Sequence, residues 1–133
     1  SLIADSDREA TEQSINSFLN CCLDMPLWLG RMLVVDTGLS ADDRALLAER
    51  YAFLEFVDAN PAAEPAAQLA QLSAQIDRRF WLHLGHGWQF FAPDNYMTRL
   101  IAILEAEPQV LQVGINYGDA AKLTNTCAAE TDV

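Results

Sequence analysis

The residues best suited to chemistry are two histidines in the second half of the chain, His83 and His86. His86 lies between Gly85 and Gly87, directly after the apolar run 80–84. The run predicts a buried strand, and the Gly-His-Gly segment predicts a tight, exposed turn at its end. In open α/β sheets, ligands bind beyond the carboxyl ends of the strands, so this turn is the first candidate site.

Each histidine has a structural interpretation beside the functional one. Residues three apart on a strand point to opposite faces, so a single metal ion binds both His83 and His86 only if the chain turns sharply after Leu84. His83 fits a core or sheet-face histidine better than a ligand. His86 is a candidate acid or base, although an ordinary loop residue would explain it equally well.

A second candidate is Asp36, which ends the apolar run 32–35 and precedes Thr37 and Gly38. A carboxylate at a strand end can accept hydrogen bonds from ring N–H groups or from ribose hydroxyls. It can also simply end the strand and bond its own turn. Asp5 has a similar place, just after the short apolar segment 2–4.

Strand and helix patterns alternate four times along the chain. The predicted strands are 2–4, 32–35, 53–57, 80–84 and 110–115. The predicted helices are 9–23, one that begins at the N-cap Ser40, one with Leu69, Leu72 and Ile76 toward the core, and one that begins at Pro93. This alternation predicts an α/β fold, a largely parallel sheet with helices on both faces.

Composition limits the function classes. The chain has 133 residues, of which 51% are hydrophobic, enough for one compact domain with a core. Its net charge of −11 repels phosphate backbones and anionic lipids, which argues against nucleic-acid partners. A nucleotide remains compatible, because helix N-termini can hold phosphates inside an acidic protein. No apolar run is long enough for membrane insertion.

Several familiar motifs are missing from the sequence. It has no P-loop, no G-x-G-x-x-G after the first predicted strand and no G-x-S-x-G, which disfavours P-loop ATPases, NAD-dependent dehydrogenases and α/β-hydrolases. Cys21, Cys22 and Cys127 form no C-x-x-C pair, which excludes a zinc ribbon or a thioredoxin-type site. Reduced thiols favour a cytoplasmic protein.

Three segments resemble the nucleotide-sugar-binding half of family 2-like, GT-A-fold glycosyltransferases. Segment 14–19 is similar to the first helix of that fold, and 33–40 is similar to its Asp-Asp-Gly-Ser strand end. Segment 83–88, followed by 109–113, is similar to the His-Leu-Glu-Asp-Asp-Trp and Gln-Val region of some bacterial members. The resemblance implies a single Rossmann-like GT-A nucleotide-binding domain over 1–118 and a loose tail over 119–133, with the acceptor half absent.

The resemblance also implies roles for individual residues. Asp36 would contact the base or ribose, and Asp5 and Gly38 would be further nucleotide-binding residues. The family's acidic motif holds Mg²⁺ or Mn²⁺ against the diphosphate, but Gly85, His86 and Gly87 occupy those positions here. Glycines supply no ligand and one imidazole replaces two carboxylates poorly, so a metal is disfavoured. His86 is the remaining catalytic candidate.

The implied function is binding of a nucleotide or nucleotide-sugar, with transfer of the sugar to an unidentified acceptor if the chain is active. Whether it is an enzyme stays open, because the metal motif and a placed base are missing. The alternative is a non-catalytic binding or interaction domain that keeps the GT-A fold without the metal site. A receiver-type regulatory domain is disfavoured, since Lys122 is the only lysine and does not follow a late strand.

Overall fold

The structure, a computed structural model, describes residues 1–59 and 63–115. It is a mixed α/β fold with a small parallel sheet. Internal contacts divide the chain into two compact units, Ser1–Tyr96 and a second that begins at Met97. None of the described helices is both long enough and apolar enough to cross a membrane.

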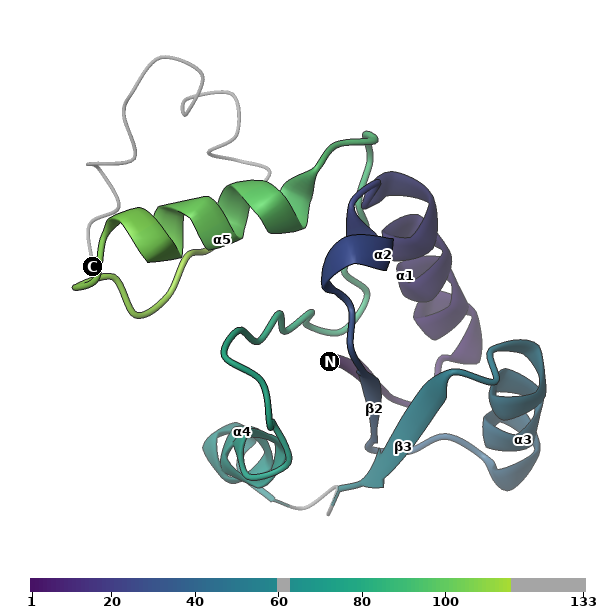
Figure 1. Cartoon of the computed structure of the whole chain (residues 1–133). Coiled ribbons are helices and arrows are strands. Elements are labelled where there is room, and N and C mark those ends of the chain that lie inside the picture. The colour runs from purple at the N-terminus through teal and green to yellow at the C-terminus, as the bar shows by residue number, and fades with distance from the viewer. Residues whose placement is uncertain (60–62, 116–133) are drawn as a thin grey trace. The chain divides into compact units, whose positions relative to one another are not determined.

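The sheet of the first unit has three parallel strands in the order β1 (Leu2–Ala4), β2 (Met32–Asp36) and β3 (Leu54–Asp58), as Figure 1 shows in part. Ala4, Asp36 and Asp58 are register partners, so the three strands end at one edge. On the other side of β1, Leu84 forms an isolated parallel bridge with Leu2. The neighbours across the unit therefore run Leu84, β1, β2, β3.

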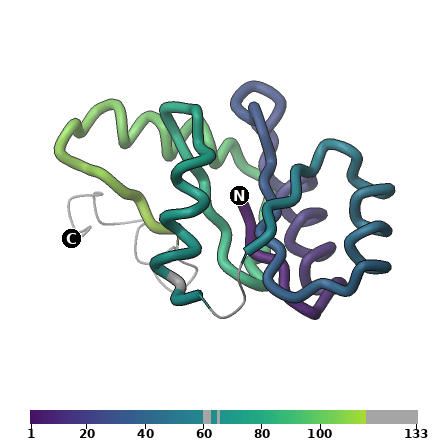
Figure 2. Tube along the Cα trace, turned by 90° about the horizontal axis from the view of Figure 1, so that it is seen from below, coloured from purple at the N-terminus to yellow at the C-terminus, as the bar shows by residue number. Residues whose placement is uncertain are grey.

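Helices cover both faces of this sheet. α1 (Arg8–Cys21) and the short α2 (Met25–Trp28) connect β1 to β2, α3 (Ala41–Arg50) connects β2 to β3, and α4 (Pro65–Ser73) comes after β3. The views in Figures 1 and 2 agree that α4 lies on one side of the strands, with α1 and α3 on the other. The predicted parallel sheet between helix layers is confirmed at this coarse level.

Side-chain alternation along the strands explains the two layers. On one face, Leu33, Val35 and Val57 form a buried cluster with Leu72 of α4. On the other face, Val34 is fully buried, and buried side chains of α1 and α3 lie on that side. The cluster explains why Leu72 is buried as predicted, whereas Leu69, also expected to face the core, remains 40% exposed.

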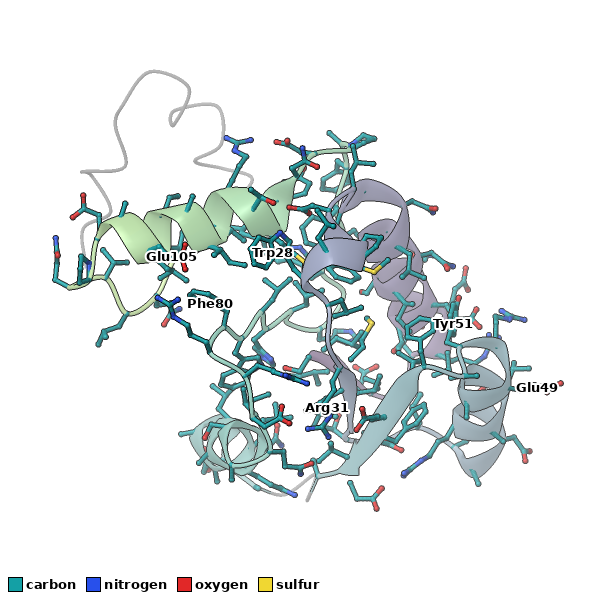
Figure 3. The ribbon with its side chains drawn as sticks, viewed as in Figure 1. Trp28, Arg31, Glu49, Tyr51, Phe80 and Glu105 are labelled. Atoms are coloured by element: carbon teal, nitrogen blue, oxygen red, sulfur yellow. The ribbon has the colours of Figure 1, made fainter. Side chains whose placement is uncertain are left out.

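Polar contacts fasten the outer elements of this unit. Tyr51, at the end of α3, donates its hydroxyl to Asn16 Oδ1 of α1 at 2.9 Å (Figure 3). At the amino edge of the sheet, Arg31 donates to both carboxylate oxygens of Glu55 in β3, at 2.6–3.1 Å, and to the Gln75 carbonyl after α4 at 3.0 Å. These contacts join α3 to α1 and α4 to the sheet without involving the carboxyl edge.

The predicted strand over 80–84 is wrong except at its last residue. Only Leu84 bridges to β1, and its N–H donates to the Ser1 carbonyl at 2.8 Å. A ladder needs several consecutive backbone pairs, and β1 is only three residues long before the chain turns at Asp5. The apolar run therefore lies beside β1 without becoming a regular strand.

The last helix begins later than predicted. Pro93 is not its first residue, because α5 spans Tyr96–Ala106. The backbone of Asp94 instead pairs with the end of α1, accepting from Leu23 N at 3.1 Å and donating to the Cys21 carbonyl at 2.9 Å, which holds that segment out of the helix.

Residues 110–115 form no strand within the described part of the chain, and Leu111 is 94% exposed. An apolar run becomes a strand only where a neighbouring strand can take its backbone hydrogen bonds. The predicted tail over 119–133 lies outside the described residues.

Candidate functional site

The carboxyl edge of the first unit contains a point where the order of the strands reverses. The chain passes from β1 to β2 to β3 in one direction and then returns to place Leu84 on the opposite side of β1. In open α/β sheets such a point leaves a crevice outside the strand ends, because the connections on its two sides depart in opposite directions. The turns after β1 and after Leu84 border this place.

The turn after Leu84 is closed by a hydrogen bond from Trp88 N to the Gly85 carbonyl at 3.2 Å. Its third residue, Gly87, has φ +67°, a conformation that type II turns require at that position and that glycine adopts without strain. A Cβ added at Gly85 or Gly87 would meet nothing within 4 Å, so the turn stands clear of its surroundings. The sequence prediction of a tight, exposed turn is confirmed.

The turn places His86 beside Asp5, which follows β1. His86 Nε2 lies 3.3 Å from Asp5 Oδ2, and the two side chains are 44% and 41% exposed. The second oxygen of Asp5 accepts a hydrogen bond from the backbone N–H of Asp7 at 2.7 Å. Two of the predicted site residues, 81 positions apart in the sequence, therefore meet at the edge of the sheet.

Asp36 is engaged within its own part of the structure. Its Oδ1 accepts from the backbone N–H groups of Gly38 and Leu39 at 3.0 and 2.9 Å, and its Oδ2 lies 3.3 Å from Arg44 Nη1. Its side chain is only 11% exposed. These contacts match the structural interpretation of Asp36, in which the carboxylate ends the strand and orders the turn that follows.

Gly38 lies in this turn, close to the turn after β1. A Cβ built on it would come 3.6 Å from Ser6 N, which is an ordinary contact, so space alone does not require glycine there. The preceding Thr37 donates both its N–H and its hydroxyl to the Ala4 carbonyl, each at 2.9 Å. The turn after β2 is thus fastened to the end of β1, next to Asp5.

His83 lies apart from this arrangement. Its Nδ1 is 2.9 Å from Ser1 Oγ, and its ring meets that of Trp81 edge to face at 5.6 Å between centroids. Burial lowers the pKa of His83, which favours the neutral imidazole. His83 is therefore half-buried and structurally engaged, in agreement with the sequence interpretation.

The sequence argument missed Asp58 and Arg44. Asp58 ends β3 beside Asp36, and Arg44 of α3 pairs with both carboxylates while its guanidinium lies 5.0 Å above the Phe56 ring. A signal was available for Asp58, because parallel strands end at a common edge and each of the three strand ends bears an aspartate. Nothing in the spacing singled out Arg44.

The donor set does not fit a divalent metal. Across residues 1–59 and 63–115, no three His, Cys, Asp or Glu side chains group closely enough to hold one. The nearby oxygens of Asp36 are occupied by Arg44 and by backbone N–H groups, and one imidazole with one carboxylate falls short of the oxygen ligands that Mg²⁺ prefers.

Neither of the two described cysteines, Cys21 and Cys22, supplies a nucleophile to this edge. Burial raises the pKa of Cys22 to about 12, so its thiol stays protonated at neutral pH. The Cys21 thiol donates to the Phe90 carbonyl at 3.5 Å. Cys127 lies outside the described residues.

Comparisons with family models, with curated proteins and with solved structures found no match to this chain. An exposed carboxylate can accept hydrogen bonds from hydroxyl groups, and the imidazole beside it can donate or accept one and can also move a proton.

Proposed function

We propose that the first unit is a Rossmann-like domain of GT-A type that binds a nucleotide or nucleotide-sugar at the carboxyl edge of its sheet. The main support is the contact of His86 with Asp5, 3.3 Å apart, at the point where the strand order reverses. In open α/β sheets ligands bind at such a point, and Gly85, His86 and Gly87 of the turn are exposed there.

In this proposal the residues divide into two roles. Asp5 and His86 contact the ligand, because their exposed polar atoms meet at the carboxyl edge of the sheet. Asp36 and Gly38 position the turn after β2, which borders the same place through the bond of Thr37 to Ala4. The proposal assigns no residues to a metal ion, because no three His, Cys, Asp or Glu side chains suited to hold one lie together in the described part of the chain.

Sugar transfer by this chain alone is not part of the proposal. Transfer needs charge neutralisation on the leaving diphosphate and a base for the acceptor hydroxyl. His86 is the candidate catalytic residue at this edge, and one imidazole cannot serve both purposes. We expect no sugar transfer when the isolated chain is incubated with a nucleotide-sugar and assayed by mass spectrometry.

Thermal unfolding in the presence of UDP, GDP, TDP, ATP and GTP, each with and without Mn²⁺, tests the binding proposal. We expect at least one nucleotide to raise the unfolding temperature without Mn²⁺, and His86→Gln to remove the increase. Glu49→Gln is the control, because Glu49 is exposed on α3 and points away from the sheet (Figure 3). An increase that survives in His86→Gln contradicts the assigned site.

The second candidate is a binding or interaction domain that keeps the fold without nucleotide chemistry. It is favoured by Arg44, whose guanidinium pairs with the carboxylates of both Asp36 and Asp58. The polar groups at the end of β2 therefore already have hydrogen-bonding partners within the chain. If no nucleotide in the panel changes the unfolding temperature, this candidate replaces the first.

A further inference from the structure

The charges at the carboxyl edge bear on which part of a ligand it can hold. Two guanidinium groups, those of Arg8 and Arg44, lie there among a larger number of carboxylates. The carboxylates at this edge include those of Asp5, Asp7, Asp36, Asp43 and Asp58, and the first turns of α1 and α3 add Glu9 and Asp42. Even with a protonated His86 added, the negative charges outnumber three positive ones, and such a field repels a phosphate group.

Both arginines are already engaged. Arg44 pairs with Asp36 and Asp58, while Arg8 pairs with Glu12 at 2.9 Å and Asp43 at 3.0 Å. A phosphate that recruited either guanidinium would have to displace a carboxylate and leave it beside its own negative charge. This exchange gains little, because one anion simply replaces another.

Helix N-termini are the usual alternative for binding phosphate. α1 and α3 begin just after β1 and β2, beside the turns that border the Asp5 and His86 pair, whereas α4 follows β3, the strand farthest from Leu84, and has no side-chain cap. At α1, Asp7 Oδ1 accepts from Ala10 N at 3.0 Å. At α3, Ser40 Oγ accepts from Asp43 N at 3.1 Å.

In the turn that leads into α3, backbone donors are also bonded to a side chain, because the N–H groups of Gly38 and Leu39 donate to Asp36 Oδ1. The chain's own side chains thus already bind backbone N–H groups at the starts of α1 and α3 and in the turn after β2, and in two of these three cases they bring a negative charge.

The Asp5 and His86 pair remains accessible. A carboxylate oxygen accepts hydrogen bonds from hydroxyl groups, and an imidazole can donate or accept one. We infer that this site, taken as the nucleotide site proposed above, holds the uncharged, hydroxyl-bearing part of its ligand, the ribose or sugar ring, and gains no affinity from the phosphates. The site is then selective for a nucleoside or sugar over a diphosphate, and this inference rests on the proposed function.

Calorimetric titration with uridine and UDP, and with guanosine and GDP, in buffer free of divalent metal tests this selectivity. We expect each nucleoside to bind at least as tightly as its diphosphate. Measurably tighter binding of the diphosphate would overturn the inference and leave the proposed function standing. If neither nucleosides nor nucleotides bind, the proposed function fails, and the inference fails with it.

The variant Asp7→Ser sharpens the test, because serine is an equally good N-cap residue but has no charge. Removing this carboxylate from the start of α1 should strengthen diphosphate binding about threefold or more and leave nucleoside binding unchanged. The same substitution tested in 0.5 M NaCl should lose this gain, because salt screens exposed charges. Equal changes for nucleoside and diphosphate would show that charge at this helix start does not control the selectivity.

Discussion

The turn after β2 and the turn after β1 end neighbouring strands at the same edge, yet they are built differently. Asp36 uses its carboxylate on residues two, three and eight positions further along the chain, and its side chain is 11% exposed. In Asp5, one carboxylate oxygen accepts a hydrogen bond from Asp7 N within the turn and the other lies beside His86, and 41% of the side chain is exposed. The carboxylate of Asp36 thus holds the fold together, whereas that of Asp5 is accessible to a ligand.

The largest expected effect is a loss of stability in variants of Asp36, which tests its structural role. Asp36→Ala removes the acceptor for two backbone N–H groups and one partner of Arg44, and we expect it to lower the free energy of unfolding by about 2 kcal/mol. Asp5→Ala should lower it by only about 0.5 kcal/mol, because its contacts are solvent-exposed. Urea unfolding of both variants decides this, and equal losses would contradict the division of roles.

The second prediction tests the ligand-binding half. In a folded protein, Asp5→Asn should weaken binding of the nucleotide found in the thermal panel about tenfold, or about 1.4 kcal/mol, because an amide is a weaker acceptor than a carboxylate. Asp36→Asn should change the affinity less than threefold if it remains folded. Calorimetry on the two variants ranks them, and a larger loss for Asp36→Asn would restore to Asp36 the direct contact implied by the resemblance.

A smaller effect is expected from the two glycines that flank His86. Gly87→Ala should destabilise the protein by about 1 kcal/mol, because φ +67° disfavours any residue with a Cβ. Gly85→Ala is the matched control, since neither its φ nor its surroundings oppose a Cβ. Urea unfolding of the pair measures the difference, and a loss of similar size in both variants would mean that the turn differs from the one described.

The smallest effect concerns pH and the second histidine. Burial lowers the pKa of His83 below the usual 6.5, so the folded protein resists protonation there and the unfolded chain does not. Stability should therefore fall as the pH drops from above 6.5 toward the lower, folded-state pKa. Unfolding curves at pH 7.5 and 5.5 should show a smaller fall in His83→Gln, and an unchanged fall would remove His83 as its source.

Much of the fold followed from local patterns. The apolar runs that form the three strands, the N-cap Ser40 and the end of β2 at Asp36 could be recognised from residues close together in the sequence, such as Ser40 and Asp43, whose N–H donates to Ser40 Oγ. Local patterns failed where a strand needs a distant neighbour. Apolar content could not reveal that the segment 80–84 pairs with β1 only at Leu84, or that 110–115 forms no strand in the described chain.

The same division holds for the candidate site. The acidic charge, the aspartates at the strand ends and the glycine turn around His86 can be predicted from the sequence, because each of these depends on composition or on adjacent residues. The contact of His86 with Asp5 and the pairing of Arg44 with Asp36 and Asp58 depend instead on tertiary packing. The order of strands across a sheet is set by which buried surfaces pack together, and no local pattern in one chain records that choice.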